Sequence, residues 1–234
     1  MLSVKILALE TTEKFGSVAL LNDNHLLKEV ILPKDRRSSQ TLHPAMQTLF
    51  ETTQTAPTDI EIVAVVAGPG SFTGLRVGVT TAKVFAYTTG AKVIALDTFQ
   101  TVAFRNGGTV AGGTHETLVS VGVDAQRGEV VAAVLRQTED GNIETVNEPE
   151  LITVADWWKH ADRYNDVLFT GPALGKWSGK APPHIVLAPE SDWFPKASSA
   201  GNLAVKRVAS GRLDDAWTLL PIYSRLSAAE EKRR

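Results

Sequence analysis

Residues 6–24 read ILALETTEKFGSVALLNDN, and residues 119–142, VSVGVDAQRGEVVAAVLRQTEDGN, repeat their outline. Each copy has an apolar strand that ends at an acidic residue, then a short turn with a glycine, a second apolar strand and a polar turn. The corresponding positions are Glu10 and Asp124, and Gly16 and Gly128. Two degenerate copies of one unit predict two lobes that face each other across a cleft.

A second pair of similar stretches supports this duplication. VAVVAGPGS (63–71) and VLFTGPALG (167–175) both contain an apolar strand that ends in Gly-Pro. We therefore expect a first lobe over residues 1–105 and a second, degenerate lobe with a C-terminal tail over residues 106–234. The Gly-rich stretch 106–116 is the expected boundary between them.

The first copy continues into alternating helices and strands. The pattern predicts strands over residues 4–9, 16–21, 26–32, 60–67 and 92–97, and helices over residues 38–53, 71–90 and 98–107. In the first helix, Ser38 or Ser39 is the expected N-cap, and Pro44 is expected in the first turn. This order is typical of the ribonuclease H-like half of the actin and sugar-kinase architecture. We expect an α/β fold of that actin-like, duplicated kind, with two lobes of mixed sheets flanked by helices.

Composition excludes several classes of function. Lysine and arginine total 24 against 26 aspartate and glutamate in 234 residues, so no global basic field attracts nucleic acid or an anionic membrane. Cysteine is absent, which excludes disulfides, zinc-thiolate sites and thiol catalysis. The N-terminal apolar run is too short for a signal peptide or a membrane span, so we expect a cytoplasmic protein that does not bind membranes.

The stretch AGPGSFTGLRVG (67–78) lies between a predicted strand and a predicted helix. Leu75 stands where a Walker A loop needs lysine, Thr73 stands where a dinucleotide fingerprint needs glycine, and a hydrolase elbow would lack both flanking glycines. Two interpretations stay open: the loop amides bind an anion at the helix N-terminus, or Ser71 only caps the helix. The candidate loop residues are Gly68, Pro69, Gly70, Ser71, Phe72, Thr73, Gly74 and Arg76.

Small residues recur every fourth position along the helix that follows this loop. The stripe consists of Gly74, Gly78, Ala82, Ala86 and Gly90. Because glycine weakens a helix interior by about 1 kcal/mol relative to alanine, the stripe indicates close packing. Its partner is either the sheet of this chain or a helix of another subunit. The preceding helix offers an apolar face at Leu42, Met46, Leu49 and Phe50.

Acidic residues end three of the predicted strands: Glu10, Asp97 and Asp124. Glu10 and Asp124 occupy equivalent places in the two repeats, and we expect both to face the cleft, where they could hold magnesium or orient water. In DAQRGEV (124–130), Arg127 could hold an anion or pair with Glu129. The five histidines have no metal-site spacing, so we assign no metal site and no catalytic residue.

These motifs together resemble those of the TsaB (YeaZ) family. Its members are the dimerisation subunit of the bacterial machinery that makes threonylcarbamoyladenosine beside the tRNA anticodon. The matching stretches are ILALETT (6–12), HPAMQTLFE (43–51), AGPGSFTGLRVG (67–78), DAQRGEV (124–130) and PIYSR (221–225). The chain departs from the usual pattern at Gln126, where arginine is common, at Val131, where tyrosine is common, and at Ser38, where many members have histidine.

The resemblance implies a non-catalytic subunit that binds the paralogous catalytic subunit TsaD and cooperates with the ATPase TsaE. It implies contact with tRNA through the complex and a homodimer when the chain is isolated. The interface is expected on the two long helices, with Leu42, Met46, Leu49, Phe50, Gly74, Gly78, Ala82 and Ala86 as its residues. No cofactor is expected to be required by this chain, while ATP or ADP with magnesium at a subunit interface stays open.

Two other functions compete with the scaffold. The first is an actin-like ATPase or small-molecule kinase that holds a magnesium nucleotide in the cleft with Glu10 and Asp124. Its weakness is the hairpin ETTEKFGS (10–17), which lacks a Gly-rich phosphate turn. The second is a peptidase, for which the chain has neither a thiol nor a metal-binding histidine pair.

Overall fold

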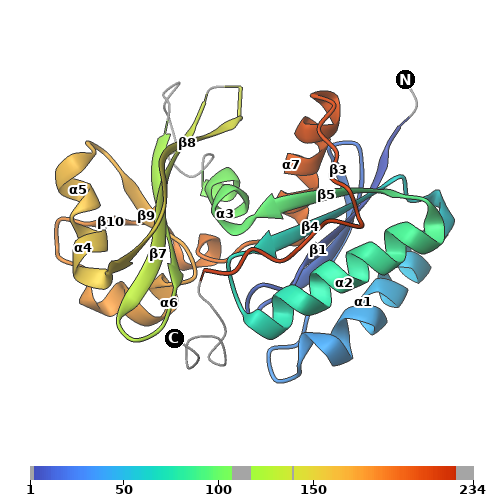
Figure 1. Cartoon of the computed structure of the whole chain (residues 1–234), viewed down its shortest axis with the longest axis horizontal. Helices are drawn as coiled ribbons and strands as arrows, with labels where there is room; N and C mark the ends of the chain where they lie inside the picture. Colours follow the sequence, from blue (N-terminus) through green and yellow to red (C-terminus); the bar gives the residue numbers. More distant parts are fainter. Residues whose placement is uncertain (1–2, 107–116, 139, 225–234) are drawn as a thin grey trace.

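The two copies of the repeat form two five-stranded sheets in a computed structural model that describes residues 3–106, 117–138 and 140–224 (Figure 1). The strands of the first sheet are β1 (Lys5–Glu10), β2 (Ser17–Asn22), β3 (His25–Ile31), β4 (Ile62–Gly68) and β5 (Lys92–Asp97). They lie in the order β3-β2-β1-β4-β5, with the β1, β2 and β3 pairs antiparallel and the β1, β4 and β5 pairs parallel. This arrangement confirms the predicted meander followed by helical crossovers.

The second sheet has the same topology. Its strands are β6 (Thr117–Asp124), β7 (Glu129–Gln137), β8 (Ile143–Thr153), β9 (Leu168–Thr170) and β10 (Val186–Leu187). The order β10-β9-β6-β7-β8 matches the first sheet strand for strand, with the same parallel and antiparallel pairs. Gly68 and Gly171, which end β4 and follow β9, both have positive φ, 128° and 109°. The predicted duplicated two-lobe fold is therefore confirmed.

Both faces of the first sheet are buried, because successive side chains of a strand point to opposite sides. Leu7 and Leu9 of β1 face the helices α1 (Ser38–Thr53) and α2 (Phe72–Thr89). Ile6 and Ala8 face α7 (Ala197–Ala209) on the other side. The near-continuous apolar runs of β1 and β4 follow from this two-sided burial.

Helices cross between the lobes. α3 (Thr98–Asn106) follows the first sheet but packs on β6 and β7, whereas α7 follows the second sheet but packs on β1, β2 and β4. The far face of the second sheet carries α4 (Val154–Trp158) and α6 (Leu174–Trp177), and α5 (His160–Arg163) follows α4. The division at residues 105 and 106 stays a prediction, and the packing of these two helices crosses it. Residues 107–116 of the expected boundary lie outside the described residues.

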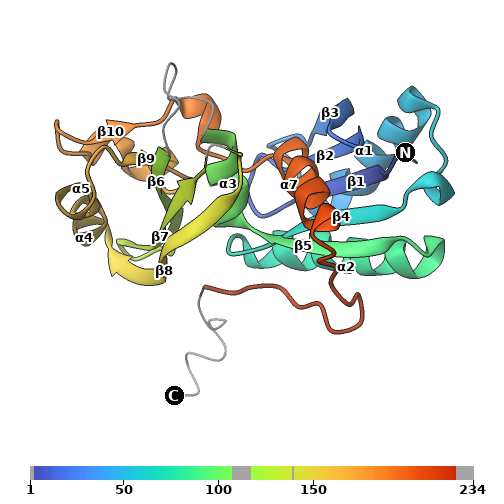
Figure 2. The same ribbon diagram turned by 90° about the horizontal axis from the view of Figure 1, so that it is seen from above.

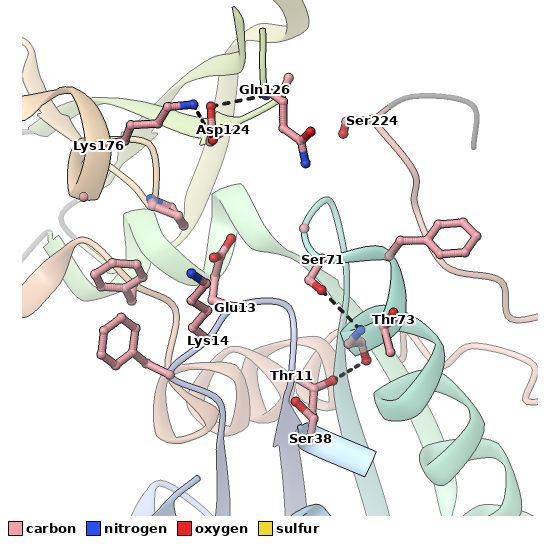
Figure 3. A pocket seen from close by; sticks show the side chains of 18 of the residues that line it. Thr11, Glu13, Lys14, Ser38, Ser71, Thr73, Asp124, Gln126, Lys176 and Ser224 are labelled. Carbon is pink, nitrogen blue, oxygen red and sulfur yellow. Dashed lines mark hydrogen bonds and ion pairs between the residues drawn. The ribbon is translucent and has the colours of Figure 1, made fainter. Parts of the chain in front are cut away.

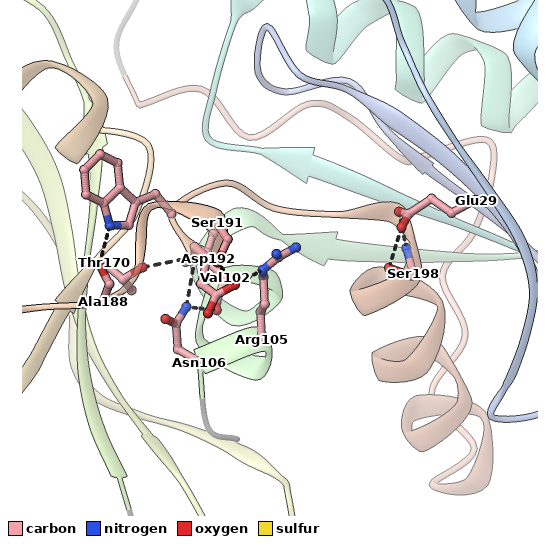
Figure 4. Close-up of polar contacts among 10 residues, drawn as sticks. Glu29, Val102, Arg105, Asn106, Thr170, Ala188, Ser191, Asp192 and Ser198 are labelled. Carbon is pink, nitrogen blue, oxygen red and sulfur yellow. Dashed lines mark hydrogen bonds and ion pairs between the residues drawn. The ribbon is translucent and has the colours of Figure 1, made fainter. Parts of the chain in front are cut away.

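Polar contacts hold the crossing segments in place (Figure 4). Arg105 of α3 donates from Nε to Oδ1 of Asp192 at 2.9 Å, and the side chain of Asn106 donates to the carbonyl of Asp192 at 3.1 Å. At the start of α7, the backbone N–H and hydroxyl of Ser198 donate to the carboxylate of Glu29 on β3, each at 3.0 Å. The linker between β10 and α7 is thus tied to α3, and the start of α7 is tied to β3.

The helix α1 has the predicted bounds, but its N-cap differs from the sequence prediction. Arg37 is the N-cap, without a side-chain hydrogen bond, and Ser38 and Ser39 lie within the helix. Pro44 therefore lies inside the helix rather than in its first turn. The core contacts of Leu42 and Leu49 on either side of Pro44 outweigh the local preference for capping and for an early proline.

The start of α2 follows the capping prediction, because the Ser71 hydroxyl accepts a hydrogen bond from the Gly74 N–H at 3.4 Å. Two glycines of the small-residue stripe, Gly74 and Gly78, pack on Thr11, the residue after β1. A Cβ added at Gly74 would lie 1.9 Å from the carbonyl oxygen of Thr11, and one at Gly78 would lie 2.3 Å from the Thr11 hydroxyl. Gly74 and Gly78 therefore serve close packing within this chain, whereas Gly90 is the C-cap of α2 and a Cβ there would meet no atom within 4 Å.

After α7 the chain returns along β5 and α2, as Figure 2 shows. The segment 213–224, here called the strap, begins with a bridge between Asp214 and Val93 of β5. Lys83 of α2 donates to carbonyls of the strap, and the Ile222 N–H donates to the Ala67 carbonyl at 2.7 Å. Among the described helices, none has the length and hydropathy that crossing a membrane requires.

We expect Gly74→Ala to lower the free energy of unfolding by about 1–3 kcal/mol or more, because the new methyl group meets backbone that cannot turn aside. Helix propensity alone would favour alanine by about 1 kcal/mol. A loss of stability in Gly74→Ala can therefore be attributed to the contact of the new methyl group. Urea denaturation followed by circular dichroism measures it. Gly179→Ala is the control, since a Cβ there meets no atom within 4 Å, and a Gly74→Ala chain as stable as the parent would contradict the argument.

Candidate functional site

A cleft of about 1160 Å³ opens between the two lobes (Figure 3). The first lobe lines it with the hairpin between β1 and β2, the turn before α1 and the loop before α2. The second lobe contributes the turn after β6, residues 124–127, and residues near the start of α6. Tyr223 and Ser224 at the end of the strap complete the lining. The predicted cleft therefore exists, and both repeats contribute to it.

Glu10 does not face this cleft, contrary to the sequence expectation. Its side chain is fully buried, and its Oε1 accepts hydrogen bonds from the N–H and hydroxyl of Thr12 at 2.5 and 2.6 Å. Oε2 has no hydrogen-bond partner among the described residues. Burial raises the pKa of Glu10 from 4.5 to about 8, although the Thr12 hydrogen bonds oppose the shift. The residue is a sealed, largely protonated acid at neutral pH.

Asp124, its equivalent in the second repeat, does line the cleft. Its carboxylate forms an ion pair with Lys176 at 3.3 Å and accepts a hydrogen bond from the Gln126 N–H at 3.2 Å. The acid is thereby partly neutralised and held in its own lobe. Val131, another of the three departures from the family pattern, is buried in the second lobe and does not reach the cleft.

The acid that joins Asp124 in the cleft is Glu13, which the sequence analysis did not select. Burial, reinforced by the negative charge of Asp124, raises the pKa of Glu13 to about 7, and Lys14 opposes the shift. Glu13 stands three residues beyond the strand-end acid, in the hairpin turn, where no spacing rule marks it.

Asp97, the third strand-end acid, has a different role. It caps α3 by accepting a hydrogen bond from the Gln100 N–H at 2.6 Å, and burial raises its pKa to about 6.

The glycine-rich loop forms one wall of the cleft and is braced against the end of β1. The Ser71 N–H donates to the Thr12 carbonyl at 2.7 Å, and the Thr11 hydroxyl donates to the Gly74 carbonyl at 2.8 Å. Gly70, Ser71, Phe72, Thr73 and Gly74 line the cleft. Gly68 and Pro69, joined by a cis peptide bond, lie behind it. The capping interpretation of Ser71 describes the loop, and anion binding there stays a prediction.

Arg76, the last candidate residue of this loop, turns toward the strap. Its guanidinium lies 4.0 Å from the centroid of the Phe72 ring, and its Nε donates to the Tyr223 hydroxyl at 3.0 Å. The Phe72 and Tyr223 rings are 5.0 Å apart. Arg76 therefore joins the loop to the strap and is absent from the cleft lining.

Cations outnumber acids in the cleft. Its cationic lining residues are Lys14, Lys34, Arg36, Arg37, Arg127 and Lys176, against the carboxylates Glu13 and Asp124. Three of them come from the short run KDRR (34–37) before α1. This run is the signal that could have identified them, but an overall net charge of −2 conceals a local cluster.

The residues present fit a magnesium nucleotide poorly. Glu10 is sealed away from the cleft and Asp124 is paired with Lys176. No group of three or more histidine, aspartate or glutamate residues in the described part of the chain could hold a metal ion. The hairpin turn between β1 and β2 is not glycine-rich, so it lacks the backbone cradle that active nucleotide sites offer to phosphates.

The burial of the expected interface residues contradicts their predicted role in binding a partner. Their side chains face the first sheet: Leu42, Met46, Leu49, Gly74, Gly78, Ala82 and Ala86 are buried, and Phe50 is half-buried and stacks on Phe85. A residue every fourth position marks one face of a helix but does not say which side that face meets. An interface on α1 and α2 would have to use their other, exposed faces.

Comparison with known proteins gives a consistent result. Residues 25–172 match the family model for TsaD, tRNA N6-adenosine threonylcarbamoyltransferase. The chain is 31% identical to the tRNA threonylcarbamoyladenosine biosynthesis protein TsaB of Bacillus subtilis (strain 168), over 97% of this chain and 96% of that protein. It is 30% identical to the protein of the same name from Escherichia coli (strain K12), over 98% of each chain.

Solved structures agree with this result. YeaZ from Pseudomonas aeruginosa superimposes with a TM-score of 0.76 at 25% identity, over 94% of this chain and 99% of that one. A P. aeruginosa protein with similarity to peptidase YEAZ superimposes with a TM-score of 0.77 at 23% identity, over 95% and 100% of the two chains. The second likeness shows the shared fold.

The buried acid predicts a pH dependence of stability. Between pH 4.5 and about 8 the folded chain keeps a proton on Glu10 that the unfolded chain has released, so the stability from this group is full below pH 4.5 and is lost as pH rises to 8. We expect Glu10→Gln to gain stability relative to the parent across this window, by at most about 1.4 kcal/mol per pH unit.

Urea denaturation at pH 5 to 9 measures this difference. Glu13→Gln is the matched control, and its gain should end near pH 7 because the pKa of Glu13 is raised only that far. Equal pH dependence in the parent and Glu10→Gln chains would contradict the assignment of a buried, protonated acid.

Proposed function

This chain belongs to the TsaB family of tRNA threonylcarbamoyladenosine biosynthesis proteins, and from that premise we propose that it is the non-catalytic subunit of the modification machinery. In this proposal it binds and activates the paralogous catalytic subunit TsaD, together with the ATPase TsaE, in the cytoplasm. The product is N6-threonylcarbamoyladenosine next to the tRNA anticodon. When TsaD is absent, two copies of the chain pair through the same surface.

An exposed apolar surface on the first lobe carries this proposal. Of the fourteen exposed large apolar side chains in the described residues, eight lie on α2 and the strap. This surface, here called the docking face, consists of Phe72, Val84, Tyr87, Leu213, Trp217, Leu220, Ile222 and Tyr223. Isolated apolar residues are ordinary on a surface, but a contiguous group of this size is typical of protein interfaces.

The docking face is continuous because the strap runs along α2 in the opposite direction. Trp217 contacts Tyr87 near the end of the helix, with ring centroids 5.4 Å apart, and Tyr223 contacts Phe72 at its start. Tyr87 is 73% exposed and Trp217 is 74% exposed. Exposed aromatic side chains of this kind provide most of the binding energy in many interfaces. A groove of about 650 Å³ between α2, β5 and the strap offers a place for a partner side chain.

The cleft supports an accessory role rather than an ATPase. An enzyme that uses a magnesium nucleotide needs free carboxylates near the phosphates, whereas Glu10 is sealed and Asp124 is held by Lys176. Among the described residues, Glu13 is then the one other carboxylate in the cleft lining. The observation that would favour the enzyme is magnesium-dependent ATP binding by the isolated chain that Asp124→Asn removes.

The test is threonylcarbamoyl transfer to tRNA, reconstituted from TsaD, TsaE and the enzyme that supplies the activated intermediate, with and without this chain. We expect transfer to require the chain, while the chain alone turns over no ATP. Full transfer without the chain, or ATP turnover by the chain alone, would contradict the scaffold role.

Removing the aromatic pair of the docking face should weaken the complex without unfolding the chain. We expect Tyr87→Ser/Trp217→Ser to raise the Kd for TsaD at least tenfold, a loss of about 1.4 kcal/mol or more, because two exposed anchors are lost. Calorimetric titration with TsaD measures the Kd, and circular dichroism checks the fold. The control is Val186→Ser on the second lobe, which is 62% exposed. An unchanged Kd in the double variant would place the interface elsewhere.

A further inference from the structure

The cationic residues of the cleft differ in how their charge is used. Lys176 is paired with Asp124, whereas Lys34, Arg36 and Arg37 have no carboxylate partner within the described residues. All three are exposed, and the Nζ of Lys34 lies 4.1 Å from the Phe15 ring centroid. Asp35, in the same turn, is the nearest acid in sequence and does not line the cleft. We call Lys34, Arg36 and Arg37 the cationic rim. In a chain of net charge −2, these three residues create a local positive field at the cleft.

Aromatic rings accompany these charges. Phe15, Phe72, Phe194 and Tyr223 all line the cleft. Phe15 and Phe194 are packed together with ring centroids 4.8 Å apart, while Phe72 and Tyr223 are each 40% exposed. Grooves that bind single-stranded nucleic acid combine cations that follow the backbone with aromatic rings on which bases stack.

Hydrogen-bond donors at the cleft also favour a phosphate-containing ligand. α1 and α2 begin at the cleft, with Ser38, Ser71 and Thr73 in its lining (Figure 3). The first N–H groups of a helix have no intrahelical partner and favour phosphate oxygens. These donors add to the cationic rim on the same side of the cleft, next to Lys14 of the hairpin.

We propose that the cleft between the lobes is a binding groove for an unpaired RNA segment, whose phosphates lie on Lys34, Arg36 and Arg37 and whose bases meet the cleft aromatics. The inference rests on the proposed function, which gives the chain a tRNA substrate. A volume of about 1160 Å³ exceeds the usual range for a small-molecule pocket, about 300–1,000 Å³.

The experiment measures binding of the full chain to unmodified tRNA and to its isolated anticodon stem-loop by fluorescence anisotropy, over a range of salt. Arg36→Glu/Arg37→Glu is compared with Lys28→Glu/Arg163→Glu, which makes the same charge change at exposed positions outside the cleft lining. We expect the cleft variant to bind RNA at least tenfold more weakly than the control. For the cleft variant, the slope of the logarithm of the binding constant against the logarithm of the salt concentration should become smaller in magnitude by about 1.4. This is the change expected when two phosphate contacts to a single strand are lost.

Two outcomes would overturn the inference. Equal RNA binding by the two variants would place the RNA elsewhere, and displacement of the RNA by magnesium ATP would make the cleft a mononucleotide site. Failure of the proposed function is distinguishable, because it appears as threonylcarbamoyl transfer that does not need the chain. TsaD binding by the cleft variant should stay unchanged, since the docking face is intact.

Discussion

The close contact between the glycine-rich loop and the end of β1 is the constraint on which the rest of the structure depends. A Cβ at Gly74 has no room beside the Thr11 carbonyl, and one at Gly70 would lie 2.6 Å from the Thr12 side chain. Hydrogen bonds from Ser71 and Thr11 join the same two segments. This contact sets where α2 begins, forms one wall of the cleft and places Gly68 against the strap at Ile222. The cleft and the docking face therefore share one support.

Divergence of the two repeats follows from what covers each strand end. In the first lobe, the loop before the 18-residue helix α2 packs over Thr11 and Thr12, beside the sealed acid Glu10. In the second lobe, the corresponding helix α6 has only four residues, and Asp124 stays open to the cleft with Lys176 as its partner. Burial turns Glu10 into a protonated core group, while Asp124 forms an ion pair with Lys176 at the cleft. Glu10 and Asp124 therefore do not form a symmetric pair of acids that face the cleft.

The apolar and cationic surfaces meet at the cleft, where Phe72 of the docking face is also part of the lining. The docking face lies on α2 and the strap, and the cationic rim lies in the cleft at the turn before α1. Tyr223 belongs to both regions, because the strap ends at the cleft and its ring contacts Phe72. A subunit with this arrangement can hold a protein partner through apolar contacts while a charged ligand lies beside it.

Sequence alone determined the order of the elements in the first lobe, the duplication and the family, because these depend on periodicity, turn residues and motifs that are local in the chain. It offered the Ser71 cap as one of two interpretations of the loop. It did not determine which side of α1 and α2 is buried, since the spacing of Leu42, Gly78 and Ala82 suits a core and an interface equally. Only the tertiary structure decided that these residues face the sheet, that Glu10 is sealed, and that Glu13 and the run 34–37 meet the second lobe. Burial and the meeting of charges depend on distances between segments far apart in the sequence, which no local pattern contains.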